Sequence, residues 1–199
     1  MRQPKRSSQL TSGYVSRAAY KLASVADIFK LDFTGKIVLD AGSSTGGFTD
    51  YSLRHGAKKV IAIDKGTRQM VPVLAFDTRV ELHEKTDIRQ FHLNETVDIV
   101  LIDLSFISLK EILPSLSIQL NPDCTIVAMI KPQFETDDQN ILHKGIIKNE
   151  HMRRAVLLGF EQWLKPRFFI QAKADSKLAG KKGNLERFYL LRPNHQIHP

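Results

Sequence analysis

The run LDAGSSTGGFTD at residues 39–50 decides the fold of this 199-residue chain. An apolar, β-branched stretch ends on Asp40, a glycine-rich loop follows, and an amphipathic segment begins at Phe48. This order predicts a strand, a tight turn and a helix N-terminus, which together let the backbone approach a nucleotide-like ligand closely. A second apolar run ends on Asp64, 22 residues after Gly42, where a carboxylate can accept hydrogen bonds from ribose hydroxyls.

The charges around this loop distinguish between possible cofactors. No lysine or arginine lies between Asp40 and Asp50, and these two carboxylates bracket the loop. A dinucleotide would bring two negative charges to the loop, whereas S-adenosyl-L-methionine (AdoMet) brings a sulfonium cation. The pattern favours AdoMet over NAD. A turn whose glycines serve only for packing, and an NAD-dependent oxidoreductase, remain as alternatives.

Length and composition restrict the class of protein. A chain of 199 residues fits one domain with a substantial core. No apolar run approaches the ~20 residues needed to span a bilayer, and the N-terminus lacks the apolar block of a signal peptide. The single Cys124 lies in an apolar run and predicts a buried, reduced thiol. We therefore expect a cytoplasmic protein without a membrane partner.

The net charge of +8 is distributed unevenly. Residues 1–22 hold five Lys/Arg residues and no Asp/Glu. Residues 23–140 hold twelve Lys/Arg and seventeen Asp/Glu residues, and residues 141–199 hold twelve Lys/Arg and four Asp/Glu residues. If the two basic ends meet in the fold, they form a positive surface beside an acidic cofactor pocket, which suits a polyanion such as RNA. A solvated basic tail is the alternative for the first residues. The candidate RNA-binding residues are Lys5, Arg6, Arg17, Lys181 and Lys182.

Strand-like and helical patterns alternate along the chain. Strands are predicted near 36–41, 58–64, 79–84, 97–103, 124–131, 167–174 and 185–191, and helices near 14–30, 46–55, 67–76, 108–120 and 148–164. This alternation predicts an α/β fold with a doubly wound, Rossmann-like, seven-stranded and mostly parallel sheet. The last two strands follow each other without a helix, so we expect them to form an antiparallel hairpin.

Charged residues end several of these strands, at the edge where doubly wound sheets bind ligands. Asp103 ends one strand and Lys131 ends the next. A lysine at this partly desolvated edge loses hydration, which favours its neutral form, and Asp103 would hold it in position. Lys21 lies at the edge of the apolar stripe of the first helix, where it either snorkels along the surface or points into a site.

Five motifs resemble one family over residues 14–192. They are SRAAYKL (16–22), LDAGSSTGGFTD (39–50), VLIDLSFISL (100–109), IKPQFE (130–135) and GNLERFYLL (183–191). In this order they resemble the FtsJ-like RNA ribose methyltransferases, and most closely their haemolysin A (TlyA) branch. SRAAYKL is closer to the FtsJ branch, since small alanines stand where the other branch has glycines.

The resemblance implies an AdoMet-dependent rRNA ribose 2′-O-methyltransferase with a Lys-Asp-Lys-Glu tetrad. The tetrad residues would be Lys21, Asp103, Lys131 and Glu186. The residues implied to bind AdoMet are Gly42, Ser43, Ser44, Thr45, Gly46, Gly47, Phe48, Asp64, Asp87 and Asp103. We expect RNA as the partner, neither DNA nor a membrane, and no metal ion.

The chain also departs from the haemolysin A pattern. Members of that branch usually carry an N-terminal S4 RNA-binding domain, whereas 13 mainly basic and polar residues precede the first helix here. We expect a basic arm at 1–13, a methyltransferase domain at 14–192 and a tail at 193–199. RNA docking would then rest on the arm, on the basic segment 173–187, or on a partner.

Two further alternatives remain open at this stage. The first is a non-catalytic RNA-binding module that retains the methyltransferase fold; the four tetrad residues argue against it. The second is a membrane-lytic haemolysin, as the branch name suggests, although the predicted helices have the pattern of core packing rather than of surface activity.

Overall fold

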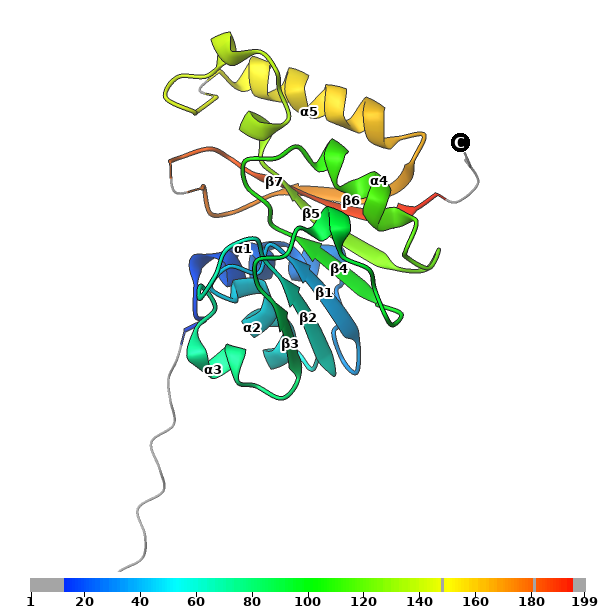
Figure 1. Ribbon diagram of the computed structural model, residues 1–199. Helices are drawn as coiled ribbons and strands as arrows, with labels where there is room; N and C mark the ends of the chain where they lie inside the picture. Colours follow the sequence, from blue (N-terminus) through cyan, green and yellow to red (C-terminus); the bar gives the residue numbers. More distant parts are fainter. Residues whose placement is uncertain (1–12, 148, 181, 195–199) are drawn as a thin grey trace, which may run out of the picture.

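One sheet runs through the molecule in the strand order β3-β2-β1-β4-β5-β7-β6 (Figure 1). The computed structural model describes residues 13–147, 149–180 and 182–194, and the sheet has seven strands within them. The strands are β1 (Ile37–Ala41), β2 (Lys59–Ile63), β3 (Val80–His83), β4 (Ile99–Ile102), β5 (Thr125–Ile130), β6 (Phe168–Asp175) and β7 (Arg187–Pro193). The first five strands are parallel to one another, whereas β7 is antiparallel to both β5 and β6. The predicted doubly wound α/β sheet with a final antiparallel hairpin is confirmed.

Each face of the sheet has its own hydrophobic core, because successive strand residues point to opposite faces. In β1, Leu39 and Ala41 belong to one core and Val38 to the other. The helices are α1 (Arg17–Phe29), α2 (Gly47–Arg54), α3 (Pro72–Ala75), α4 (Leu113–Ser117) and α5 (Glu150–Leu164). Helices α1, α2 and α3 pack in one core, and α4 and α5 pack in the other. This three-layer arrangement leaves the carboxyl ends of the parallel strands free to form a site.

Two predicted helices are much shorter in the structure. The helix predicted at 67–76 is reduced to α3, because Val71 precedes Pro72 and is extended, with ψ of 141°. The helix predicted at 108–120 is divided into a 3₁₀ turn, η2 (Leu109–Glu111), and α4. Pro114 lacks the N–H that would continue one helix through both segments. Both proline positions were visible in the sequence, and the predicted lengths were wrong.

The chain between these elements is mostly short loops and single 3₁₀ turns. The turns are η1 (Ile88–Gln90), η2, η3 (Pro132–Phe134) and η4 (Gln139–Ile141). Cys124 is buried, as predicted, and burial raises the pKa of its thiol to about 12. No helix among the described residues is long and apolar enough to span a bilayer.

Candidate active site

The loop after β1 is clamped between the ends of β2 and β4. Gly42 and Gly46 have φ of 90° and 93°, in the left-handed region that favours glycine. A Cβ atom at position 42 would lie 2.5 Å from the carbonyl oxygen of Asp103. The N–H groups of Gly42 and Ser43 both donate to the carbonyl of Ile63, at 2.8 and 3.1 Å. The loop can therefore lie against β4 only because residue 42 has no side chain.

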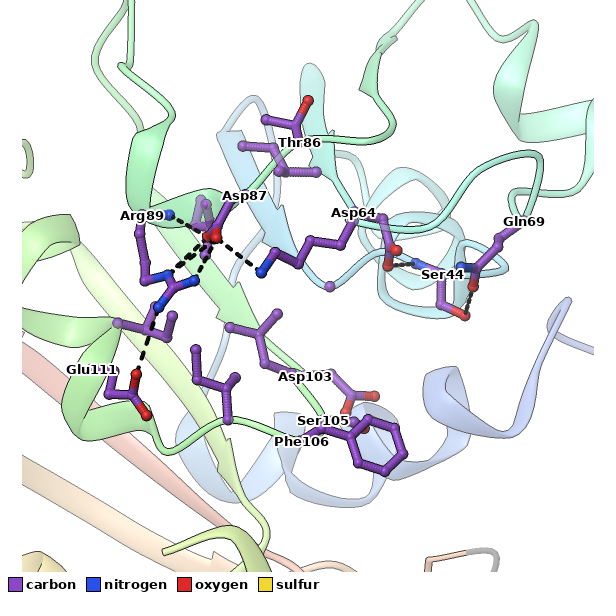
Figure 2. A pocket seen from close by; sticks show the side chains of 17 residues that line it. Ser44, Asp64, Gln69, Thr86, Asp87, Arg89, Asp103, Ser105, Phe106 and Glu111 are labelled. Carbon is purple, nitrogen blue, oxygen red and sulfur yellow. Dashed lines mark hydrogen bonds and ion pairs between the residues drawn. The ribbon is translucent and has the colours of Figure 1, made fainter.

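Beside this loop lies a cavity of about 610 Å³, a volume typical of small-molecule sites (Figure 2). Its walls come from the β1 loop, the end of β2, the loops after β3 and β4, and η2. The lining residues include Gly42, Ser44, Asp64, Lys65, Gln69, Asp87, Arg89, Asp103, Ser105, Phe106 and Glu111. The cavity thus occupies the edge of the sheet where the sequence predicts the cofactor.

Asp64 lines the cavity at the end of β2, as predicted, and backbone amides fix its carboxylate. The N–H of Ser44 donates to Oδ2 at 2.8 Å, and the N–H of Gly66 donates to Oδ1 at 2.6 Å. Each carboxylate oxygen can accept more than one hydrogen bond, so both retain acceptor capacity toward the cavity. A carboxylate held in this way is suited to bind a pair of ribose hydroxyls.

Asp87 also lines the cavity, but side chains of this protein already surround its carboxylate. The guanidinium of Arg89 donates to both oxygens, and Lys65 Nζ lies 2.9 Å from Oδ2. These partners, Arg89 first, hold the pKa of Asp87 well below its usual range. The lining as a whole remains acidic, with the four carboxylates of Asp64, Asp87, Asp103 and Glu111 against the two cations of Lys65 and Arg89.

Two ion pairs contain the four residues of the predicted tetrad. Lys131 Nζ, directly after β5, lies 2.6 Å from Asp103 Oδ1, directly after β4. Lys21 on α1 pairs with Glu186, which directly precedes β7. All four side chains are largely buried, with 4 to 17% of each exposed. Lys21 therefore points inward to a partner and does not snorkel along the surface.

The sheet register places the two ion pairs next to each other. In the antiparallel pairing of β5 with β7, Ile130 lies opposite Arg187. One residue further along, Lys131 and Glu186 therefore occupy facing positions at the same edge. The fold thus brings two lysines and two carboxylates from α1 and from the ends of β4, β5 and β7 to one side of the cavity.

Residues 14–192 match the model of the FtsJ-like methyltransferase family, which is nearly the whole chain. The chain belongs to the FtsJ-like methyltransferases. The division into a basic arm, a methyltransferase domain and a tail stays a prediction.

Curated members of the family show where this FtsJ-like chain lies within it. It is 37% identical, over 183 residues, to the 16S/23S rRNA (cytidine-2′-O)-methyltransferase TlyA of Mycobacterium tuberculosis, covering 90% of this chain and 68% of that protein. It is 39% identical to Hemolysin A of Brachyspira hyodysenteriae, covering 87% and 74% of the two chains. A putative hemolysin of Streptococcus thermophilus superposes with a TM-score of 0.87 at 34% identity, covering 96% and 70%. The predicted resemblance to the haemolysin A branch is confirmed.

The remaining predicted cofactor residues of this FtsJ-like protein are not among the residues that line the cavity. These residues are Ser43, Thr45, Gly46, Gly47 and Phe48. Phe48 is buried against Phe188, so only its backbone could contact a ligand. A Cβ at Gly47 would lie 2.2 Å from Ser16 Oγ, because the start of α1 packs against the start of α2. Their role as cofactor ligands stays a prediction.

Basic segments from the two ends of the FtsJ-like domain meet next to the tetrad. Arg17 donates to the carbonyl of Ala179 at 3.0 Å, and the N–H of Lys177 donates to Ser24 Oγ at 3.3 Å. Lys182 is exposed in the same segment. The predicted RNA-binding residues Lys5, Arg6 and Lys181 lie outside the described residues. The two ends of the domain, whose meeting the predicted positive surface requires, are thus in contact between α1 and residues 177–179.

The two carboxylates predicted to bracket the loop both lie away from the cavity. Asp50 pairs with Arg54 at 2.6 Å and accepts a hydrogen bond from the N–H of Val15. Asp40 is buried and accepts a hydrogen bond from Thr49 Oγ1 at 2.6 Å, while its Oδ1 has no hydrogen-bond partner among the described residues. Burial raises the pKa of Asp40 to about 7.

We expect Asp40→Asn to change the pH dependence of stability. An aspartate whose pKa is raised from about 4 to about 7 on folding stabilises the fold below pH 4, and this contribution is lost as the pH rises to 7. Asparagine retains the acceptor for Thr49 without this loss, which amounts to at most about 4 kcal/mol. Denaturant unfolding without cofactor should show the variant gaining stability relative to wild type between pH 5 and pH 8. A difference that stays constant over this range would contradict the prediction.

Sequence reasoning missed three residues that contact or surround the tetrad. Ser105 Oγ accepts a hydrogen bond from Lys131 Nζ at 2.7 Å. Glu135 is buried and accepts hydrogen bonds from Ser108 Oγ at 2.5 Å and from the N–H of Leu109 at 2.8 Å. Arg153, on α5, donates to the carbonyl of Leu185 at 3.1 Å, next to Glu186. Ser105 and Glu135 belong to the DLSFISL and IKPQFE motifs, but a motif pattern alone assigns no role to either residue.

Proposed function

We propose that this protein transfers a methyl group from AdoMet to a ribose 2′-hydroxyl of ribosomal RNA. The observation that carries the proposal is the largely buried Lys131–Asp103 ion pair, whose Asp103 lines the cavity, flanked by the Lys21–Glu186 pair. Relatives at 35 to 37% identity are named rRNA (cytidine-2′-O)-methyltransferases, which supports the substrate class. An rRNA substrate implies action in the cytoplasm.

The described residues fit AdoMet better than a dinucleotide. Four carboxylates and two cations line the cavity, so the wall favours a cationic ligand over a pyrophosphate. The carboxylate of Asp64 would bind the ribose hydroxyls, and Gly42 allows the backbone to approach closely. Asp87 would bind the edge of the adenine base only if the ligand displaced Lys65 or Arg89 from its carboxylate.

The mechanism follows from the positions of the charged groups. A ribose 2′-hydroxyl is a poor nucleophile, so a neutral Lys131 would accept its proton as methyl transfer begins. Asp103 holds the amine at the edge of the cavity. Glu186 holds Lys21, and this pair would contact the incoming ribose. AdoMet, when bound, supplies a methyl group on a sulfonium, which is an inherently good electrophile. The main contribution of the protein is therefore orientation of the two reactants.

The basic residues next to the tetrad would bind the RNA backbone. Arg17, Lys177 and Lys182 lie on α1 and on the segment that leads to Glu186. Phosphate contacts of this kind position RNA without reading its sequence. For a 2′-hydroxyl to reach Lys131, the target nucleotide must leave its stack, because the tetrad is largely buried.

The test is transfer of labelled methyl from AdoMet to small ribosomal subunits, large subunits, free rRNA and DNA. We expect label in RNA, and resistance of one linkage to alkaline cleavage would place the methyl group on a ribose. The Lys131→Ala variant serves as the inactive control. Tight RNA binding with no labelled product on any substrate would overturn the proposal and favour the non-catalytic RNA-binding module.

A further inference from the structure

Lys131 has a second partner in addition to Asp103. Its Nζ donates to Ser105 Oγ at 2.7 Å. Ser105 lies two residues after Asp103, in the loop that leaves β4, and its side chain lines the cavity (Figure 2). One short segment thus supplies both groups that contact the amine.

The two contacts of Lys131 differ in direction. The contact with Asp103 Oδ1, at 2.6 Å, is an ion pair without the alignment of a hydrogen bond, since that oxygen has no hydrogen-bond partner among the described residues. The contact with Ser105 has hydrogen-bond geometry. Charge attraction depends weakly on angle, whereas a hydrogen bond weakens steeply when it bends. Ser105 is therefore the contact that defines how the amine is oriented.

The loop that carries Ser105 is anchored on both sides of it. Before it, Asp103 is fixed by the end of β4, where its N–H donates to Ala41. After it, the buried Glu135 accepts hydrogen bonds from Ser108 Oγ and from the N–H of Leu109. Glu135 follows Lys131 by one 3₁₀ turn, so the loops after β4 and β5 are joined at two points, by the Lys131 contacts and by Glu135.

Between these anchors the backbone is strained. Phe106, directly after Ser105, has φ of 67° in the left-handed region, which is unusual for a bulky residue. Its ring packs against Phe134, with ring centroids 5.2 Å apart, although 89% of the residue is exposed. Strain of this kind persists only where the surrounding structure enforces it, and it is common at functional sites. The loop is thus built to hold Ser105 at a fixed place.

We propose that Ser105 is a positioning residue that orients the lone pair of neutral Lys131 toward the 2′-hydroxyl. A neutral primary amine has two N–H groups and one lone pair on nitrogen. If one N–H donates to Ser105 and the Asp103 carboxylate attracts the other by charge, the lone pair takes the one remaining direction. The proton leaves the ribose oxygen for this lone pair, and the resulting ammonium still has an N–H for each partner. The inference rests on the proposed function, because it assigns Lys131 as the base.

Ser105→Ala tests the inference, because it removes one oxygen atom from an exposed position outside both cores. We expect kcat for RNA methylation at saturating AdoMet to fall about 10- to 100-fold, because the reacting amine is misoriented, with the KM for RNA within about twofold of wild type. Ser105→Thr keeps the acceptor oxygen and should recover most of the rate. Ser117→Ala, which removes a hydroxyl bonded within α4, is the matched control.

A double-mutant comparison separates positioning from a general structural effect. In single-turnover assays, Ser105→Ala should not lower the methylation rate further in the Lys131→Ala background, because Ser105 acts through the amine of Lys131. Equal and additive losses in both backgrounds, or a wild-type kcat for Ser105→Ala, would overturn the role of Ser105. Absence of turnover by the wild-type protein on every RNA would instead overturn the proposed function, so the two failures are distinguishable.

Discussion

Replacement of Lys131 by alanine is expected to lower kcat for RNA methylation by about 10²- to 10⁴-fold, the usual contribution of a general base. The residue lies between Asp103 and Ser105, at the edge of the cavity, and 11% of its side chain is exposed. The Kd for AdoMet, measured by calorimetry, should change little because Lys131 is not among the residues that line the cavity. The rate is measured as labelled methyl incorporated into RNA.

Lys131→Arg distinguishes a base from a simple positive charge. A guanidinium keeps the charge and can still pair with Asp103, but it stays protonated and cannot accept the proton of the hydroxyl. We therefore expect Lys131→Arg to be as inactive as Lys131→Ala. Lys58, an exposed lysine that precedes β2 at the opposite edge of the sheet, provides the control variant Lys58→Ala with a wild-type rate. Substantial activity in Lys131→Arg would contradict general-base catalysis by this residue.

Gly42→Ala is expected to damage both folding and cofactor binding. The new Cβ would lie 2.5 Å from the carbonyl oxygen of Asp103, a backbone atom at the end of a central strand that cannot move easily. The left-handed φ of 90° adds about 1–2 kcal/mol, and overpacking of a tight site costs a further ~1–3 kcal/mol. Because the loop must shift away from β4, the Kd for AdoMet should rise more than tenfold.

Gly35→Ala separates the backbone cost from the steric one. Gly35 also has a left-handed φ, of 70°, but a Cβ there meets no atom within 4 Å. This control should lose about 1–2 kcal/mol in denaturant unfolding, with AdoMet affinity unchanged. Equal effects of the two substitutions on AdoMet affinity would show that close approach of the loop to β4 is unimportant for the cofactor.

The parts of the fold predicted best from sequence were those with a regular pattern. The strands up to β6 alternate with helices or turns, and the central parallel strands β1, β2, β4 and β5 carry runs of apolar residues because both faces of the sheet are covered there. Asp103 and Lys131 could be located in advance because strand ends share one edge. The predicted helices at residues 67–76 and 108–120 were too long, because a proline interrupts an otherwise helical pattern in each.

Sequence pattern alone could not find the partners of these residues. From the sequence alone, Glu186 has the pattern of an ordinary exposed charge. The pairing of β7 with β5 places it opposite Lys131. Its assignment came from the family resemblance. Ser105 was missed for a related reason, because a lone serine after a strand end carries no periodic signal. The carboxylates of Asp50 and Asp40 do not contribute to the charge of the cavity wall, because Asp50 pairs with Arg54 and Asp40 accepts a hydrogen bond from Thr49.

The position of β7 in the sheet has a consequence for how the site comes into existence during synthesis. This last strand lies between β5 and β6, and β6 joins the sheet only through it. Lys21 meets Glu186 across 165 positions of sequence, which is a contact of very long range. Such contacts form late, after the local elements have folded. A chain still emerging from a ribosome therefore lacks the complete tetrad, and activity toward RNA begins only once residues 186–193 are free to pair with the earlier strands.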